Sequence, residues 1–132
     1  MRADWPQIIK DVGFDFSWDE KKVWALDVPV SQIDIGELLW HFNIPFLSEG
    51  DGIYNLTPRE VLVQPGLHNK EYKRMLVVDL RYAIDIMENK GRWTILDGLH
   101  RLMKMVFYGI YGVGQVDVRR IPREKIPEIV KE

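Results

Sequence analysis

Apolar and polar positions alternate most regularly in the second half of the chain. Over Tyr82–Met87 the apolar residues Tyr82, Ile84 and Ile86 fall on every second position, which is the period of a β-strand. Arg92–Leu96 has a similar composition and predicts a second strand. The polar segment Glu88–Gly91 lies between them and ends in glycine, so the two strands are expected to form a hairpin.

The next segment changes to helical spacing. Its apolar residues recur at i, i+3, i+4, i+7, i+8 and i+11, a pattern typical of an amphipathic helix. Gly112 and Gly114 are expected to end this helix, and Gln115–Ile121 predicts a last strand. A strand, a helix and another strand in this order can form a right-handed crossover that places two strands in parallel in a mixed sheet. The apolar positions of the helix are Leu99, Leu102, Met103, Val106, Phe107 and Ile110.

The first half is less regular. Val23–Ile33 alternates and predicts a strand, in which Pro29 favours a sheet edge or a bulge. Ile35–Phe42 predicts a short helix and Asn43–Asn55 a loop. The aromatic residues around Trp40–Leu47 are expected in the core, or alternatively in one wall of a substrate pocket or a partner-binding face.

Two further helices are predicted downstream. Thr57 and Glu60 can form a capping box, and Pro58 suits the first helical position. Pro65 and Gly66 are expected to end that helix, and the charged residues 68–76 predict the next one.

The elements together predict an α+β fold in which a small mixed β-sheet is flanked by helices. A length of 132 residues suits one domain. We expect a single domain over residues 1–132, with an N-terminal arm over 1–22, a core over 23–121 and a C-terminal tail over 122–132.

Composition narrows the class of protein. Hydrophobic residues make up 46% of the chain and charged residues 29%, which favours a folded protein over a disordered one. No apolar run is long enough for a membrane span, and the charged N-terminal segment does not resemble a secretory signal. The absence of Cys excludes disulfides and thiol chemistry. We therefore expect a cytoplasmic protein without a membrane partner.

Charge is distributed unevenly along the chain. Residues 1–66 carry five Lys and Arg against eleven Asp and Glu, whereas residues 67–132 carry thirteen against nine. An anionic ligand would therefore find its positive contacts in the second half.

The junction between the second hairpin strand and the strong helix is the best candidate site. The N-terminus of a helix presents unpaired N–H groups and a partial positive charge. His100, Arg101 and Lys104 lie off the apolar stripe near this end, and Gly98 allows a ligand to approach the backbone closely. Asp97 is expected to be the N-cap, and alternatively to hold Mg²⁺ or to orient a hydroxyl.

Two interpretations of the junction stay open. Cations at a helix N-terminus are unfavourable unless an anion offsets them, and such a local conflict is typical of a functional site. In that case the backbone amides of Gly98, Leu99 and His100 would bind phosphate together with the side chains of His100, Arg101 and Lys104. Alternatively, Asp97 only caps the helix, Gly98 only forms the turn, and the basic side chains are solvated.

The sequence Trp93–Leu102, followed by Val116–Arg119, resembles the ParB/sulfiredoxin superfamily. Members of this superfamily carry a Gly-x-His-Arg or Gly-Glu-Arg-Arg signature between a strand and a helix, and the signature grips the phosphates of ATP, ADP or CTP. The resemblance covers residues 23–121 and is specific around residues 93–102. It implies a ParB/sulfiredoxin-like fold, phosphate contacts from Gly98, His100 and Arg101, and ATP, ADP or CTP with Mg²⁺ as the ligand.

The chain also departs from the superfamily. Sulfiredoxins have a reactive Cys at the position of Leu99, so sulfinic-acid reduction is excluded here. Chromosome-partitioning ParB proteins have Glu at the position of His100 and continue into a helix-turn-helix region, so DNA clamping of that type is not expected. The free-serine kinases of the superfamily read Asp-Gly-His-His-Arg and use a carboxylate base near the first strand, for which Asp34 and Glu37 are candidates.

The sequence thus predicts a nucleotide- or phosphate-binding domain. If the protein is an enzyme, it is an ATP- or ADP-dependent phosphotransferase or a nucleotide hydrolase, with Asp97 and His100 as catalytic candidates. An alternative is a non-catalytic DNA- or protein-interaction module that dimerises, and another is a domain that has lost its ligand. The interaction module would use the basic cluster Arg119, Arg120, Arg123 and Lys125.

Two smaller expectations complete the list of candidates. No pair of histidines has a metal-ligand spacing, so no metal site is expected beyond Mg²⁺ at Asp97. Asp85 is either an exposed strand residue or faces the same cleft as Asp97, if their strands are adjacent.

Overall fold

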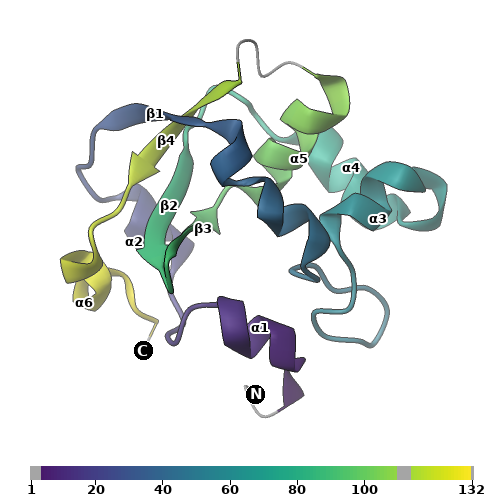
Figure 1. The fold of residues 1–132 in the computed structure, drawn as a ribbon, viewed down its shortest axis with the longest axis horizontal. Helices are drawn as coiled ribbons and strands as arrows, with labels where there is room; N and C mark the ends of the chain where they lie inside the picture. Colours follow the sequence, from purple (N-terminus) through teal and green to yellow (C-terminus); the bar gives the residue numbers. More distant parts are fainter. Residues whose placement is uncertain (1–3, 110–113, 132) are drawn as a thin grey trace.

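The protein is described by a computed structural model that covers residues 4–109 and 114–131. Four strands form one sheet, and helices and short 3-10 turns surround it (Figure 1). The strands are β1 (Val30–Asp34), β2 (Ile84–Asn89), β3 (Arg92–Asp97) and β4 (Gln115–Arg120). The α-helices are α1 (Gln7–Val12), α2 (Glu20–Trp24), α3 (Pro58–Val63), α4 (Asn69–Val77), α5 (Leu99–Tyr108) and α6 (Ile126–Ile129).

The strand order in the sheet is β1-β4-β2-β3. The β1/β4 and β2/β3 pairs are antiparallel and the β2/β4 pair is parallel. The sheet is therefore mixed, which confirms the predicted α+β class. The two strands that flank α5 are not the parallel pair, however, because β2 lies between β3 and β4 and runs antiparallel to β3.

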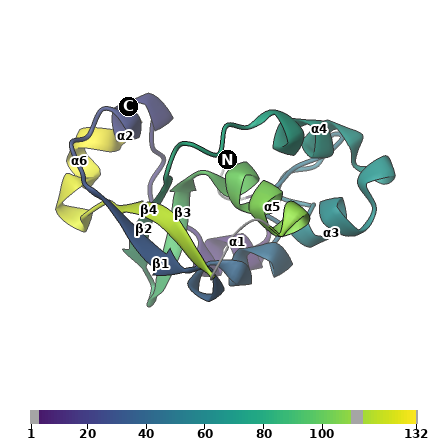
Figure 2. The ribbon, with the colours of Figure 1, turned by 90° about the horizontal axis from the view of Figure 1, so that it is seen from above.

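Apolar side chains cover both faces of the sheet. Ile84 and Ile86 belong to the main core, whereas Met87 belongs to a second cluster, as expected for neighbouring residues that point to opposite faces of a strand. Helices α3, α4 and α5 pack on the main core, and residues of the N-terminal segment, α2 and α6 pack on the other side (Figures 1 and 2). The second cluster comprises Phe14, Val23, Met87, Leu96, Ile121 and Ile129.

The predicted hairpin is confirmed. Asn89 pairs with Arg92, so Lys90 and Gly91 form a two-residue loop. Both have positive φ, 52° and 81°, which is the geometry of a type I′ turn. Glycine takes the second position at no steric cost.

The helices of the middle region also follow prediction. Thr57 and Glu60 form a capping box at the start of α3, with Pro58 in the first turn. Helix α4 occupies the predicted segment. No helix in the described part of the chain has the length and apolarity that crossing a membrane requires.

Three boundary predictions were wrong. The segment predicted as a strand over Val23–Ile33 contains the end of α2, and β1 begins only at Val30, after Pro29. The predicted helix over Ile35–Phe42 is instead two short 3-10 turns, Ile35–Glu37 and Leu39–Asn43. Helix α5 ends at Gly109, which adopts a left-handed conformation. Ile110 and Gly112 lie outside the described residues.

Candidate functional site

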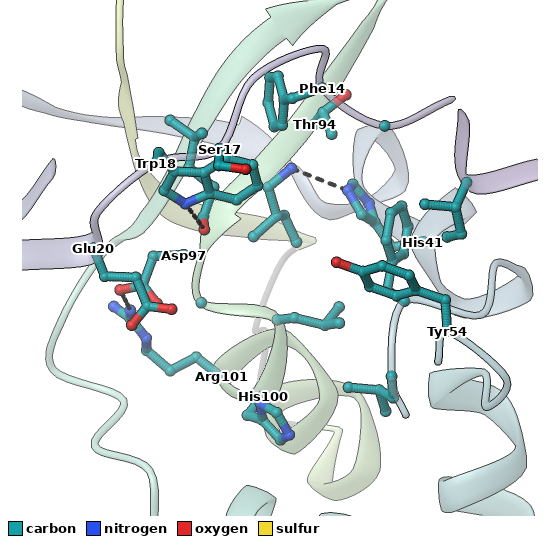
Figure 3. A pocket seen from close by; sticks show the side chains of 18 of the residues that line it. Phe14, Ser17, Trp18, Glu20, His41, Tyr54, Thr94, Asp97, His100 and Arg101 are labelled. Carbon is teal, nitrogen blue, oxygen red and sulfur yellow. Dashed lines mark hydrogen bonds and ion pairs between the residues drawn. The ribbon is translucent and has the colours of Figure 1, made fainter. Parts of the chain in front are cut away.

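A pocket of about 600 Å³ lies along β3 and the start of α5. Its volume is within the range of small-molecule sites. Gly98, Leu99, His100 and Arg101 of the predicted junction line it, whereas Lys104 does not. Figure 3 shows polar side chains (Asp97, Glu20, Arg101) on one side of the pocket and aromatic ones (Phe14, Trp18, His41, Tyr54) on the others.

Gly98 sets the geometry of the junction. It is the N-cap of α5 with φ of 119°, a conformation that residues with a Cβ rarely adopt. A Cβ built on Gly98 would lie 3.1 Å from Cγ2 and 3.2 Å from Cα of Ile84. The glycine is therefore required by its conformation and by close packing on β2, in addition to any approach by a ligand.

Asp97 does not cap α5, contrary to the prediction. It precedes the N-cap, and its Oδ2 accepts hydrogen bonds from Trp24 Nε1 at 2.7 Å and from Arg101 Nη2 at 2.8 Å. Gly98 has no side chain to act as a cap, so the first N–H groups of α5, whose residues line the pocket, have neither a side-chain cap nor an intrahelical partner among the described residues.

Arg101 is held in place by two contacts. Its guanidinium donates to the Ala83 carbonyl and to Asp97. A guanidinium has five N–H donors in a fixed plane, so the remaining N–H groups are available while these two contacts fix its direction. Arg101 is thus a positioned cation in the pocket wall rather than a solvated one.

His100 contacts a buried carboxylate. Its Nε2 lies 2.6 Å from Oε2 of Glu71, a residue of α4 that is 5% exposed, and Arg74 lies 3.5 Å from the same carboxylate. Burial lowers the pKa of His100, and the hydrogen bond that His100 donates to Glu71 acts in the opposite direction. With Nε2 engaged, Nδ1 is the atom of His100 left for other partners.

Lys104 belongs to the scaffold. Its Nζ donates to the carbonyls of Leu76 and Val78 at 2.9 and 3.0 Å, at the C-terminal end of α4. A cation there complements the helix dipole. The prediction that Lys104 contacts phosphate is therefore not supported by its position.

Asp85 and Asp97 are register partners on β2 and β3. Two carboxylates opposite each other repel, and each has its own arginine. Arg119 lies 2.7 Å from Asp85 and also donates to the carbonyls of Val23 and Leu26. Burial raises the pKa of Asp85, whereas the hydrogen bond from Arg119 opposes that shift. Asp85 is buried behind the junction and does not line the pocket.

The other members of the basic C-terminal cluster also have internal partners. Arg120 bonds to Ser31 and to the Gln32 carbonyl and stacks over Trp93. Arg123 donates to the Glu88 carbonyl and to Asn89. These contacts leave Arg120 half-buried, whereas Arg123 is exposed.

The aromatic walls of the pocket were largely missed from the sequence. His41, Phe46 and Leu47 line it, in line with the alternative that this region forms a pocket wall. Nothing in the sequence placed Phe14, Trp18 or Trp24 in the lining of the same pocket. The only signal was the density of aromatic residues in an otherwise polar arm.

His41 is neutral and built into this wall. Its Nδ1 lies 2.7 Å from the Leu38 carbonyl, and its Nε2 accepts from the Ile95 N–H at 3.1 Å. Burial lowers the pKa of His41 to about 4. A proton on Nε2 would break the bond to Ile95, so His41 connects its turn to β3 only in the neutral form.

Thr94 is the exception among the polar residues of the wall. It is 2% exposed, and its hydroxyl has no hydrogen-bond partner among the described residues. An unpaired buried hydroxyl costs stability. Buried polar groups in native proteins are nearly always paired, so this hydroxyl marks an unusual position in the wall.

The described residues contain no group of three or more His, Asp or Glu side chains arranged to hold a metal ion. The chain matches no protein-family model, no curated protein and no solved structure. The interpretation of the site therefore depends on its own geometry and chemistry.

Proposed function

We propose that the protein binds a nucleotide or another phosphorylated small molecule, with the phosphate at the N-terminus of α5. The observation that carries the proposal is the open end of α5, whose first residues line the pocket beside a positioned Arg101. Backbone N–H groups at a helix N-terminus and a guanidinium are complementary to phosphate oxygens.

The charges around the pocket are compatible with this ligand. Arg74 and Lys131 line it together with Arg101. The carboxylate of Asp97 is offset by its ion pair with Arg101 at 2.8 Å, which leaves Glu20 as the other acidic side chain of the lining. Mg²⁺ would fit as a companion of the phosphates, with Asp97 as a protein ligand, because Mg²⁺ sites commonly combine one carboxylate with substrate phosphates.

The resemblance to the ParB/sulfiredoxin superfamily points to ATP, ADP or CTP as the nucleotide. If the protein transfers or hydrolyses a phosphoryl group, His100 is the better candidate for moving a proton. Its Nδ1 is left free by the bond to Glu71, whereas Oδ2 of Asp97 already accepts two hydrogen bonds.

The DNA-binding alternative has less support. The guanidinium groups of Arg119, Arg120 and Arg123 donate hydrogen bonds to backbone carbonyls and to internal polar groups. Side chains held in this way are poorly placed to neutralise DNA phosphates, which is the main source of affinity for DNA.

A thermal-shift panel of ATP, ADP, CTP and GTP, each with and without Mg²⁺, tests the proposal. A ligand at about 100 times its dissociation constant adds roughly 2.7 kcal/mol to the free energy of unfolding. For a domain of this size we expect a rise in Tm on the order of 10 °C.

Arg101→Ala is expected to abolish the shift, because it removes the charged donor that is held beside the N-terminus of α5. Arg81→Ala is the matched control, since Arg81 is exposed, pairs with Asp79 and lies outside the pocket lining. The proposal is wrong if no nucleotide shifts the wild type, or if Arg101→Ala keeps the full shift.

A further inference from the structure

Two tryptophans of the N-terminal segment are attached to the end of β3. Trp18 Nε1 donates to the Leu96 carbonyl at 3.0 Å, and Trp24 Nε1 donates to Oδ2 of Asp97 at 2.7 Å. Both indoles line the pocket. Their hydrogen bonds go to consecutive residues, so the orientation of both rings is fixed relative to the junction.

Trp24 combines this fixed orientation with exposure. Its side chain is 54% exposed, which is unusual for a large aromatic residue that is also hydrogen-bonded. The same oxygen of Asp97 accepts from Arg101 at 2.8 Å. One carboxylate atom thus holds an accessible aromatic ring directly beside the cation of the proposed phosphate site.

The pocket wall continues this aromatic surface. Phe14 packs edge-to-face against Trp18 with ring centroids 5.1 Å apart, and Tyr54 faces the cavity from the opposite side (Figure 3). The Thr94 hydroxyl lies in the same wall, near Phe14 (Figure 3). This buried hydroxyl has no hydrogen-bond partner among the described residues.

We propose that Trp18, Trp24 and Phe14 form a nucleobase subsite, with the exposed indole of Trp24 as its stacking surface. This inference depends on the proposed phosphate site for its second anchor. It specifies the ligand as a nucleotide rather than a sugar phosphate or inorganic phosphate. It also makes the N-terminal segment part of the binding site.

Calorimetric titration of the wild type gives the first test and requires no variant. Ribose 5-phosphate is compared with the 5′-monophosphates of adenosine and cytidine, which differ from it by the base. Stacking of a base on an aromatic side chain changes affinity by roughly 5- to 150-fold. At least one nucleoside monophosphate is therefore expected to bind tighter than ribose 5-phosphate by that factor.

Trp24→Leu tests the residue itself. It should weaken binding of the better nucleotide by roughly 5- to 150-fold and leave binding of inorganic pyrophosphate unchanged. Trp24→Phe keeps an aromatic ring without the N–H, and its affinity for that nucleotide should lie between those of the wild type and Trp24→Leu. Tyr82→Leu is the control, because Tyr82 is 63% exposed and does not line the pocket.

The possible failures are distinguishable. Equal affinities for ribose 5-phosphate and both nucleotides, or an unchanged nucleotide affinity in Trp24→Leu, would overturn the nucleobase subsite and leave the phosphate site standing. Binding of free adenosine or cytidine that Trp24→Leu abolishes, without any binding of pyrophosphate, would support the subsite and overturn the phosphate site. If none of these probes binds to the wild type, both proposals fail.

Discussion

Two groups of basic residues look alike in the sequence but differ in their surroundings. Arg119, Arg120 and Arg123 follow one another at the end of β4, and each has internal partners. His100 and Arg101 at the start of α5 also have internal partners, yet they line a pocket together with Gly98 and Leu99 at the uncapped end of that helix. The first group connects elements of the fold, and the second presents donors to a cavity.

The comparison extends to the polar atoms of the two regions. Around Arg119 a buried carboxylate and two backbone carbonyls are satisfied. Along the pocket, the Thr94 hydroxyl has no hydrogen-bond partner among the described residues, and no described side chain caps the first N–H groups of α5. The number of arginines therefore says little about a binding surface, whereas polar groups left unpaired beside a cavity indicate one.

The largest expected effect concerns Arg119. Arg119→Ala would leave the buried carboxylate of Asp85 without its ion-pair partner and remove two bonds to the end of α2. Breaking a buried pair in this way costs roughly 3–5 kcal/mol. Urea unfolding measures the loss. The affinity for inorganic pyrophosphate, measured under conditions where the variant is folded, should stay at the wild-type value.

The double variant Asp85→Asn/Arg119→Ala serves as the control for this prediction. It removes the unpaired charge and should recover part of the lost stability. A marked loss of pyrophosphate affinity in Arg119→Ala would instead contradict the division between the two basic groups.

The second-largest expected effect is a pH dependence of stability caused by His41, a pocket-wall residue that bonds to Leu38 and Ile95. Its pKa is lowered from 6.5 to about 4 in the folded protein. Between pH 6.5 and pH 4 the imidazole is therefore protonated in the unfolded chain but stays neutral in the folded one. The free energy of unfolding is unaffected by this titration above pH 6.5, and it falls by about 3 kcal/mol as the pH is lowered from 6.5 toward 4. Urea unfolding between pH 7 and pH 4 measures this loss.

His41→Gln is the matched variant, because an amide can also donate to the Leu38 carbonyl and accept from Ile95 but does not titrate. Its stability should depend less steeply on pH over the same interval. Parallel pH profiles of wild type and variant would show that His41 is not the group responsible.

Local pattern was sufficient to predict the elements of the second half. The period of β2, the turn at Lys90 and Gly91, and the stripe of α5 all result from contacts between near neighbours in the sequence. The same approach failed at Val23–Ile33, where Trp24 and Leu26 alternate by coincidence. Asp19, whose side chain accepts from the Lys21 N–H at the start of α2, was the overlooked helix signal.

The candidate site was predicted only in part, for a related reason. Gly98, His100 and Arg101 were found because they adjoin a strand–helix boundary. Their partners come from distant parts of the chain, since the bonds from Trp18 and Trp24 to β3 span 78 and 73 residues. Periodicity carries no information about such contacts, and a charged residue such as Lys104 therefore could not be assigned to scaffold or site from the sequence.

The smallest expected effect is a gain in stability rather than a loss. Thr94→Val replaces the unpaired buried hydroxyl with a methyl group of similar shape, and should raise the free energy of unfolding by about 1 kcal/mol. Thr94→Ser, which keeps the hydroxyl and loses the methyl group, should lower it. Thermal unfolding of both variants without ligand measures the difference. If Thr94→Val is less stable than the wild type, the hydroxyl already has a partner in the free protein, and Thr94 belongs with Arg119 to the scaffold rather than to the site.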